Sequence, residues 1–494
     1  MKVKNLKNNE KEISFIKFIL QKAQQVDFII ILTCYLLSYI GIRYCYPYPF
    51  SFSDSGGYVD AAVKDAFYVY RPFGYSYFLQ VLHSVSTNIH FIFIVQLFLL
   101  FFATCFFAFT IKYFFTPNRK WVWYLSLSFL IFTPTSFFMA NYILSDLFFA
   151  VQVYCILSLF IFIIKRKSWI AVILYILILF TALHVRYSAM IFPFILLPFF
   201  FMKKGLIRWV IMFLSIFTFS IFYSQIKKSM KEATKIEQFS TGFDGWVYAN
   251  NVFYTLPHID LKVEDLETQK LRKLHEFIMK DIDTVKRNID DNATIHAGFM
   301  WNKNLPLKKY LIQTMQEQSL PYLPAFVKLG SGVYKDYAIY IITHYPFSYL
   351  RYYYLPNLKQ TFYPAEGCLV WQDTVRHKVI YEYYKIDEAN TMRAKHDILN
   401  PKYPYHSTMR ILHLIMWTVI AGIGITAIIK RKKLIFSFDD KVVFWGLFCF
   451  AVIYYASSVF AAPMEIRYFI SMHSIQFAFI YILLNKIFSS QKQV

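Results

Sequence analysis

Long apolar runs separated by short polar segments dominate the chain. The first run begins at Phe28, and nine more follow at 89–115, 121–138, 147–164, 169–183, 189–201, 209–223, 411–429, 442–460 and 469–484. A membrane-crossing helix needs roughly 20 residues, so the pattern predicts about ten crossings. The runs 169–183 and 189–201 are short and are expected to form a broken or partly inserted pair. The expected fold class is therefore an all-α polytopic membrane protein.

Composition supports this interpretation and excludes several others. Of the 494 residues, 57% are hydrophobic and only 17% are charged, whereas a soluble domain carries roughly 25% charged residues. A soluble fold of this length has too little interior to bury so many apolar runs. A soluble enzyme, a secreted disulfide scaffold and a disordered protein are thus excluded.

The six cysteines indicate no specific reaction or binding site, and metal-binding motifs are absent from the sequence. Four cysteines lie within apolar runs and are interpreted as packing residues, whereas Cys45 and Cys368 lie outside these runs, and their pairing stays open. The sequence contains no CxxC or HExxH motif, so no zinc site is predicted.

The basic residues predict how the chain crosses the membrane. The net charge is +22, but no basic and aromatic groove pattern indicates a nucleic-acid partner. If the lysine-rich start is cytoplasmic, four basic loops fall on the same side, at 118–120, 165–167, 203–204 and 430–433. The alternate short loops carry almost no basic residues, which is the positive-inside pattern. Both termini are therefore predicted to be cytoplasmic.

This topology divides the chain into three parts. Residues 1–225 form an N-terminal transmembrane module with a first extracytoplasmic loop at 44–88. Residues 226–410 form a polar, mostly helical extracytoplasmic region, and residues 411–494 form the C-terminal transmembrane helices. Within the polar region, 337–354 is amphipathic and aromatic, which suits a helix lying on the membrane surface.

Charged residues at helix ends converge on the extracytoplasmic boundary in this topology. They are Asp54, Asp60 and Arg71 in the first outer loop, Asp146 at the start of the fourth helix, His184 and Arg186 at the end of the fifth, and Glu465 and Arg467 at the start of the tenth. Charges near a membrane are costly and therefore informative. Arginine binds phosphate through two donors, and a carboxylate can accept a proton from an attacking hydroxyl. The set suits a lipid-linked phosphate in the membrane and a hydroxyl arriving from water.

Each of these residues also has a purely structural interpretation. Asp54 and Asp146 both follow a serine and suit the start of a helix, where a carboxylate caps backbone N–H groups. Arg71 is at a position where an arginine can extend towards lipid headgroups. His184 suits a hydrogen-bonded interfacial histidine. The remaining two arginines, Arg186 and Arg467, can pair with Asp146 and Glu465 in structural salt bridges.

The order of the motifs resembles the GT-C superfamily of polyprenyl-phosphate-dependent glycosyltransferases. Residues 53–62 (SDSGGYVDAA) contain an Asp-x-x-x-Tyr-x-x-x-Ala pattern through Asp54 and Tyr58, and residues 70–79 contain Arg-Pro-x-Gly-Tyr. The turn at Ser145-Asp146 is similar to that group's Ser-Glu turn, with Asp where Glu is usual. Val185-Arg186-Tyr187 and Arg467-Tyr468 are also similar. The resemblance is to bacterial members of the protein O-mannosyltransferase and aminoarabinose transferase type, and it covers mainly 28–223.

The resemblance implies transmembrane helices, short surface helices in the first outer loop and a sugar donor on polyprenyl phosphate. It implies that Asp54 lies at the reacting centre, with Asp60 as a second candidate. The role of Asp146 is in doubt because its side chain is shorter than that of Glu. Tyr58 is carried over as a substrate-binding residue. Some members need a divalent cation and others do not, so a cofactor is not assigned.

We therefore expect an integral-membrane glycosyltransferase in a bacterial inner membrane, with its active site on the outer face. Asp54 would accept a proton from the acceptor hydroxyl. Arg71, Arg186 and Arg467 would bind the donor phosphate, with His184 and Glu465 nearby. The acceptor is a glycan, a lipid or a protein. The alternatives are a transporter or flippase for a lipid-linked sugar and an O-antigen ligase or polymerase. Scarce glycine (14 residues) and the absence of a visible repeat argue against a transporter.

Overall fold

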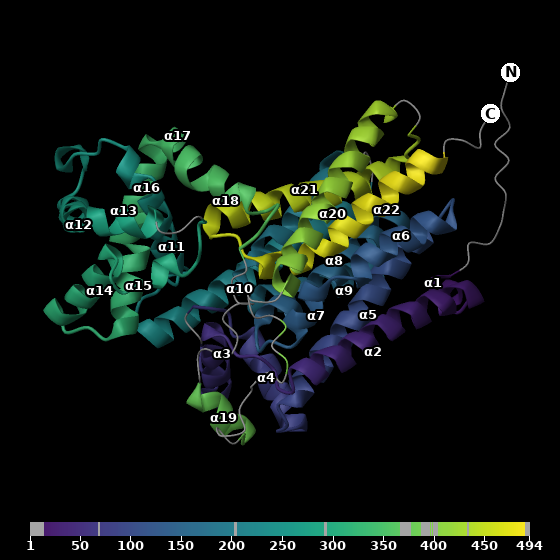
Figure 1. Ribbon diagram of the computed structural model, residues 1–494, viewed down its shortest axis with the longest axis horizontal. Helices are drawn as coiled ribbons and strands as arrows, with labels where there is room; N and C mark the ends of the chain where they lie inside the picture. Colours follow the sequence, from purple (N-terminus) through teal and green to yellow (C-terminus); the bar gives the residue numbers. More distant parts are fainter. Residues whose placement is uncertain are drawn as a thin grey trace.

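The computed structural model describes residues 14–67, 70–201, 205–290, 294–365, 377–386, 396, 398, 404–431 and 434–489. These residues form a helical bundle with a second group of helices at one end of it (Figure 1). The described part contains no β-strand, and its only extended pairings are two isolated bridges, Phe50 with Tyr142 and Ala365 with Glu465. The expected all-α architecture is therefore confirmed.

Eight helical segments are long and apolar enough to cross a membrane. They are α2 (Lys22–Cys45), α5 (His90–Phe114), α6 (Lys120–Ile131) with α7 (Pro134–Ala140), α8 (Ser145–Arg166), α10 (Leu206–Thr234), α20 (Pro404–Ile429), α21 (Phe438–Ala461), and η10 (Ile466–Met472) with α22 (His473–Ser489). Their positions coincide with eight of the ten predicted apolar runs. The chain is thus a polytopic membrane protein by the length and composition of its helices.

The two remaining predicted crossings form shorter helices. The helix α9 (Trp169–Val185) has 17 residues and covers about 26 Å at 1.5 Å per residue. The segment η1 (Tyr187–Phe201) is a 3₁₀ helix of 15 residues that contains Pro193 and Pro198. Proline removes a backbone donor, and a 3₁₀ helix rises ~2.0 Å per residue, so η1 covers about 30 Å. Both segments therefore come close to membrane thickness despite their length.

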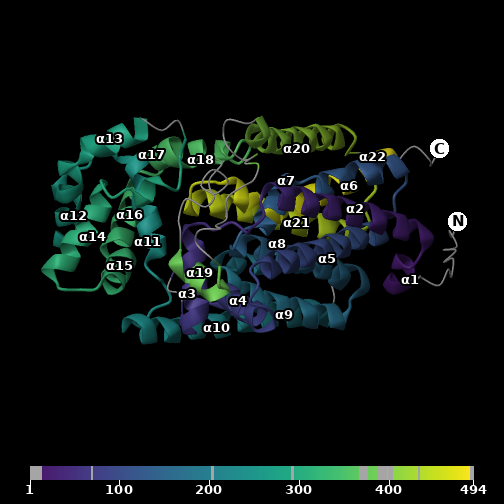
Figure 2. The same ribbon diagram turned by 60° about the horizontal axis from the view of Figure 1, so that its bottom comes forward.

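The bundle is organised around α8. This helix packs against α5 on one side and α9 on another, and 83% of its apolar window is buried inside the protein. The helices α2, α10 and α20 are mostly exposed, with 17–28% of each window buried. Figure 2 shows α8 inside the bundle, with α20 and α2 on its outside. The exposed apolar helices form the surface that faces lipid, because lipid tails are as apolar as their side chains.

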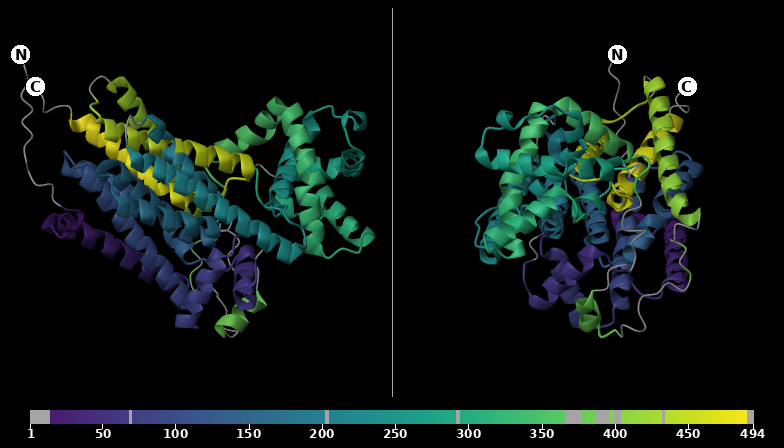
Figure 3. Two further views of the ribbon diagram at one scale, coloured as in Figure 1. Left: turned by 180° about the vertical axis from the view of Figure 1, so that it is seen from behind. Right: turned by 60° about the vertical axis from the view of Figure 1, so that its left-hand side comes forward.

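Short helices lie at both ends of the bundle. They are α1 (Phe15–Ile19) near the N-terminus, and α3 (Ser53–Lys64), α4 (Gly74–Val85) and α19 (Lys378–Tyr384) at the opposite end. Figure 3 shows α3, α4 and α19 together at the end far from both termini. The resemblance implied short surface helices in the first loop, and α3 and α4 occupy that segment.

A second hydrophobic core lies in what we name the polar domain, residues Phe243 to Lys359. It comprises α11 (Phe243–Asn251), η2 (Val252–Tyr254), η3 (Leu256–His258), η4 (Val263–Asp265), α12 (Gln269–Lys280), α13 (Ile282–Asp290), η5 (Phe299–Trp301), α14 (Pro306–Glu317), α15 (Tyr322–Ser331), α16 (Val333–His344), α17 (Pro346–Tyr349), η6 (Leu350–Tyr354) and α18 (Leu355–Lys359). Trp246, Phe326 and Tyr334 pack at its centre. The polar domain follows directly from the end of α10 (Figure 1).

An ion pair inside the bundle was not expected from the sequence. Asp27 of α2 is fully buried and pairs with Lys112 of α5, whose ammonium also donates to Gln24 at 2.6 Å. Lys112 is in the last turn of α5, and Asp27 is in the second turn of α2. The pair therefore lies near the end of the bundle that carries the termini. Of the two cysteines outside the apolar runs, Cys45 ends α2 and Cys368 lies outside the described residues.

Candidate functional site

Three contacts join the start of α3 to the start of α8. In the segments that precede the two helices, the N–H of Phe50 donates to the carbonyl of Asn141 at 2.6 Å, and the carbonyl of Phe50 accepts from the N–H of Ile143 at 3.0 Å. The Ser55 hydroxyl donates to the carbonyl of Ile143 at 2.9 Å. The hydroxyls of Tyr58 and Ser145 share a hydrogen bond of 2.8 Å. As a result, two helix N-termini from distant parts of the chain meet at one place.

Each of these helix starts presents a carboxylate in its first turn. Asp54 is the second residue of α3, and Asp146 is the second residue of α8. The N-cap residues are Phe52 and Leu144, so neither carboxylate occupies the capping position. The positive end of a helix dipole favours a carboxylate in this turn. The helix dipole therefore stabilises the ionised form of both carboxylates, and neither of them serves as the N-cap of its helix.

Arginines from three other segments surround the carboxylates. Arg71, which precedes α4, donates to Asp54 at 3.3 Å. Arg186, which follows α9, lies 2.5 Å from Asp146. The Arg467 guanidinium lies 4.0 Å from Asp54. Three cations therefore converge on a space beside Asp54.

Glu465 and Tyr468 complete the cluster from the segment before α22. The Glu465 carboxylate lies 2.8 Å from Nε of Arg467, and both side chains are buried. The Arg467 guanidinium lies 5.1 Å from the ring centre of Tyr468 and donates to its hydroxyl at 3.3 Å. Arg186 lies 6.0 Å from the same ring. Tyr468 thus separates the two guanidinium groups and holds each of them in place.

Exposure distinguishes the carboxylates of the site. The side chain of Asp54 is 26% exposed, whereas those of Asp146 and Glu465 are 4% and 6% exposed. Arg71, at 19%, is the most exposed of the three arginines. Asp54 and Arg71 are accordingly the ion pair that a ligand can reach most directly.

The surroundings shift the pKa values of two of the carboxylates, Asp54 and Glu465, in opposite directions. Burial raises the pKa of Asp54, but the positive charges of Arg71, Arg467 and Arg186 outweigh burial and bring the pKa below its ordinary value. Burial raises the pKa of Glu465, and the nearby charges of Asp146 and Asp54 add to this effect against the attraction of Arg467. Opposite shifts within one site are typical of groups with separate acid and base roles.

Two glycines of the first loop allow this close packing. A Cβ on Gly74 would lie 2.5 Å from the backbone oxygen of His184, so the start of α4 meets the end of α9 only without a side chain. A Cβ on Gly56 would lie 2.3 Å from the imidazole of His377, which bonds through Nε2 to the backbone oxygen of Phe52 at 3.0 Å. Both glycines belong to the quoted first-loop motifs, and both have a packing reason.

Two of the predicted site residues lie away from the cluster. Asp60 points elsewhere on α3, is 44% exposed and pairs with Lys64 at 2.8 Å. The His184 ring bonds to Gln225 of α10 and to the carbonyl of Phe180, both at 2.8 Å. His184 therefore joins α9 to α10, and its backbone rather than its ring touches the first loop. The structure brings together Asp54, Tyr58, Arg71, Asp146, Arg186, Glu465 and Arg467.

The carboxylates of the cluster do not form a metal site. Asp54, Asp146 and Glu465 each lie against an arginine. Among the residues that the structure describes, no group of three His, Cys, Asp or Glu side chains is placed to hold a metal ion. Magnesium and calcium require several convergent oxygen ligands, which this arrangement does not offer.

Sequence reasoning missed several residues that build the site. Ser145 and Tyr468 stand directly beside predicted residues in the motifs, and this adjacency is the signal that points to them. Asn357 has no such signal. Its buried amide donates to the carbonyls of Val459 and Ala462 and accepts from the N–H of Met464, each at 2.8 Å. It thereby fixes the turn that leads into Glu465.

Comparison with family models, curated proteins and solved structures gave no match for this chain.

Proposed function

We propose that the protein is an integral-membrane glycosyltransferase. It transfers a sugar from a polyprenyl-phosphate donor to an acceptor hydroxyl on the extracytoplasmic face of a bacterial inner membrane. The observation that carries the proposal is the convergence of three arginines on one partly exposed, ionised carboxylate, Asp54. A phosphate needs the cations, and a hydroxyl nucleophile needs the carboxylate.

The arginines of the cluster suit an anionic ligand. Arg71, Arg186 and Arg467 contribute three positive charges, and two of the neighbouring carboxylates, Asp54 and Asp146, are held beside helix N-termini. Burial disfavours the ionised form of Glu465, the carboxylate beside Arg467. Removing charges from water strengthens the interaction between an arginine and an anionic ligand.

The reaction follows from these positions. Asp54 accepts the proton of the acceptor hydroxyl, and the acceptor oxygen attacks the anomeric carbon of the sugar. The bond between that carbon and the phosphate oxygen breaks, and the electron pair leaves with the phosphate. The arginines stabilise the charge that develops there, which is usually the largest electrostatic contribution to such a step. Direct displacement inverts the anomeric configuration.

The pKa of Asp54 lies below its ordinary value, which bears on its role as a base. A carboxylate with a low pKa is fully ionised at neutral pH, but it is a weak base. It accepts the proton once the new carbon–oxygen bond has made the hydroxyl acidic. Asp54 therefore orients the hydroxyl early in the step and removes its proton late.

The transporter alternative predicts polar groups near the middle of the membrane. The buried Asp27–Lys112 pair lies near one end of the bundle, in terminal turns of α2 and α5. Its position suits a structural link between two helices.

The proposal is tested by glycosyl transfer in reconstituted vesicles. The protein is supplied with a panel of radiolabelled polyprenyl-phosphate sugars and with glycan, lipid and protein acceptors. A glycosidic product supports transfer, and its anomeric configuration should be inverted relative to the donor. Movement of labelled lipid across the bilayer with no product from any pair would favour the transporter instead.

A further inference from the structure

The segment from α17 to α18, Pro346 to Lys359, runs across the direction of the spanning helices. Figures 1 and 3 show it in green at the level where α21 ends, at the side of the polar domain that adjoins the bundle. It is one continuous helical stretch through α17, η6 and α18. A helix that lies across the ends of membrane helices, at their level, lies parallel to the membrane plane.

One side of this segment is apolar and exposed. Phe347 is 84% exposed, and Leu350 and Leu355 are 41% and 43% exposed. The opposite side is buried through Tyr349, Tyr353 and Asn357, which recur every four residues and pack against the polar domain and the end of α21. The exposed apolar side therefore has no partner within the described chain.

The charges of the segment are of one sign. Between Pro346 and Ala365 the chain contains Arg351 and Lys359 and no acidic residue. Arg351 lies on the exposed side, near Phe347. Exposed aromatic and aliphatic side chains beside basic residues are the composition of helices that lie in the interface of anionic membranes.

The exposed side is continuous with the surface that faces lipid. Phe362, which is 45% exposed, lies just beyond α18. The centre of its ring lies 5.4 Å from the ring centre of Trp417 on α20. On α20, Ile411 and Ile415 before Trp417 and Ile425 and Ile428 after it are also exposed. A membrane that surrounds α20 therefore reaches the segment without a break.

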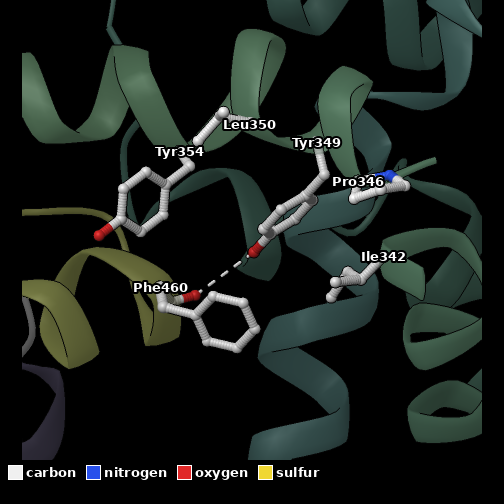
Figure 4. Close-up of a pocket in the computed structure, with 6 residues that line it drawn as sticks. All are labelled: Ile342, Pro346, Tyr349, Leu350, Tyr354 and Phe460. Carbon is white, nitrogen blue, oxygen red and sulfur yellow. Dashed lines mark hydrogen bonds between the residues drawn. The ribbon is translucent and has the colours of Figure 1, made fainter.

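A narrow apolar cavity lies between the segment and the end of α21. Its volume is about 190 Å³, and it is lined by Ile342, Pro346, Tyr349, Leu350, Tyr354 and Phe460. Figure 4 shows that the Tyr349 hydroxyl, one of the few polar groups of the lining, points toward the carbonyl of Phe460, to which it donates at 3.4 Å. Cavities for drug-sized ligands begin at roughly 300 Å³ and contain placed polar groups. This cavity is smaller and offers its occupant few polar partners, which suits part of a hydrocarbon chain.

We infer that Pro346 to Lys359 is a membrane-interface helix whose cavity holds an acyl chain of a bilayer phospholipid, in the leaflet that faces the polar domain. Phe347 and Leu355 enter the same leaflet, and Arg351 and Lys359 meet the headgroups. Asn357 couples the segment to the turn before Glu465. The position of the segment in the membrane interface thereby determines how deep Glu465 and Arg467 lie relative to the membrane. The inference depends on the membrane location of the protein and not on its proposed reaction.

The test is photo-crosslinking of the full-length protein in vesicles of phosphatidylethanolamine and phosphatidylglycerol. The photoreactive residue p-benzoylphenylalanine replaces Phe347 on the exposed side, Leu350 at the cavity or, as a control, Ile312, which is 42% exposed on α14 of the polar domain. We expect at least about tenfold more phospholipid adduct at Phe347 and Leu350 than at Ile312, because an interfacial helix buries its apolar side among acyl chains. Mass spectrometry should place the Leu350 adduct on the acyl chain.

Other adducts would overturn the inference. Equal, low lipid labelling at all three positions would place the segment in water. Adducts between Phe347 and another polypeptide would make the surface a protein interface. A polyprenyl adduct at Leu350 in membranes that also contain the donor, in place of the phospholipid adduct, would assign the cavity to the donor. Each of these results would contradict the membrane-interface inference even if glycosyl transfer were normal. The crosslinking experiment and the transfer assay therefore test the two proposals independently.

Discussion

The guanidinium of Arg186 lies 2.5 Å from the carboxylate of Asp146, although the two residues are on different helices. Asp146 starts α8, the most central helix of the bundle, and Arg186 follows the end of α9. The pair is almost fully removed from solvent. It therefore fixes the height of α9 relative to α8, and Asp146 is engaged with its partner before any substrate arrives.

Asp146→Asn should destabilise the protein. The amide leaves the buried charge of Arg186 without a counter-ion, and breaking one side of such a pair costs about 3–5 kcal/mol. Thermal unfolding in detergent measures the effect. The double variant Asp146→Asn, Arg186→Gln is the control, because it removes both charges and should recover part of the loss. A single variant as stable as the parent would show that the two charges do not depend on each other.

Asp54→Asn should reduce glycosyl transfer by about two to four orders of magnitude, because an amide cannot accept the proton of the acceptor. The chain offers a matched control on the same helix. Asp60→Asn alters a carboxylate that is exposed and paired with Lys64, so its transfer rate should remain near the parent. Both variants are assayed with a radiolabelled polyprenyl-phosphate sugar beside a thermal-stability measurement. Equal loss of activity in the two stable variants would remove the special role of Asp54.

Glu465→Gln should flatten the pH dependence of stability just above pH 4.5. Burial raises the folded-state pKa of Glu465 above its ordinary value of 4.5, so the folded protein binds more protons than the unfolded chain in this window. Stability in the parent therefore falls as pH rises from 4.5 through the folded-state pKa. The glutamine has no proton to lose, and this fall should disappear. Unfolding temperatures measured from pH 4 upwards would contradict the expectation if both proteins had the same slope.

Gly74→Ala should separate α4 from α9. The added methyl group would lie 2.5 Å from the backbone oxygen of His184, and relieving such a clash typically costs about 1–3 kcal/mol. Gly41→Ala is the control, since nothing lies within 4 Å of its Cβ position in α2. That variant should be neutral or stabilised by up to about 1 kcal/mol, because alanine favours the helix. Thermal unfolding of both variants checks the contrast, and equal values would exclude the packing explanation.

The topology prediction is tested with single cysteines in a background where all six native cysteines are serine. A membrane-impermeant thiol reagent applied outside the cell should label a cysteine at Asp290 of the polar domain and miss one at Lys167. The reason is the excess of basic residues in the loops on the Lys167 side. Permeabilised cells provide the control, because both positions are exposed and should then react. The reverse pattern would place the candidate site in the cytoplasm.

The sequence predicts at which end of the membrane helices the charged residues lie, but not which of them are neighbours. Apolar run lengths and basic loops place Asp54, Asp60, Arg186 and Arg467 at one boundary of the membrane. Which of them meet depends on how the helices rotate and pack. Asp60 is six residues after Asp54, on a different side of α3, and pairs locally with Lys64. No pattern along the chain shows that difference without the position of α8.

The packing of the polar domain and the buried ion pair of the bundle were likewise not predictable from the sequence alone. The segment 337–354 was predicted to lie on the membrane surface. Its first part, α16, buries Tyr337 in the second core, whereas its second part exposes Phe347 and Leu350. Alternation of aromatic and polar residues cannot distinguish a membrane from the interior of a neighbouring domain. Asp27, in turn, directly precedes the first apolar run, and its partner Lys112 is 85 residues away, so no local pattern indicates their pairing.

Because η1 is a 3₁₀ helix with three residues per turn, its side chains form three straight rows, or edges, along the helix. Side chains three residues apart eclipse each other in a 3₁₀ helix, and Phe194, Leu197 and Phe200 form one exposed edge at 37–57%. Ala189, Phe192 and Ile195 form a fully buried edge. Inserting one residue would therefore turn every later side chain by a third of a circle and bring an edge built for packing out to lipid. Inserting three residues would leave all the edges in place, so this segment tolerates changes of length only in steps of three.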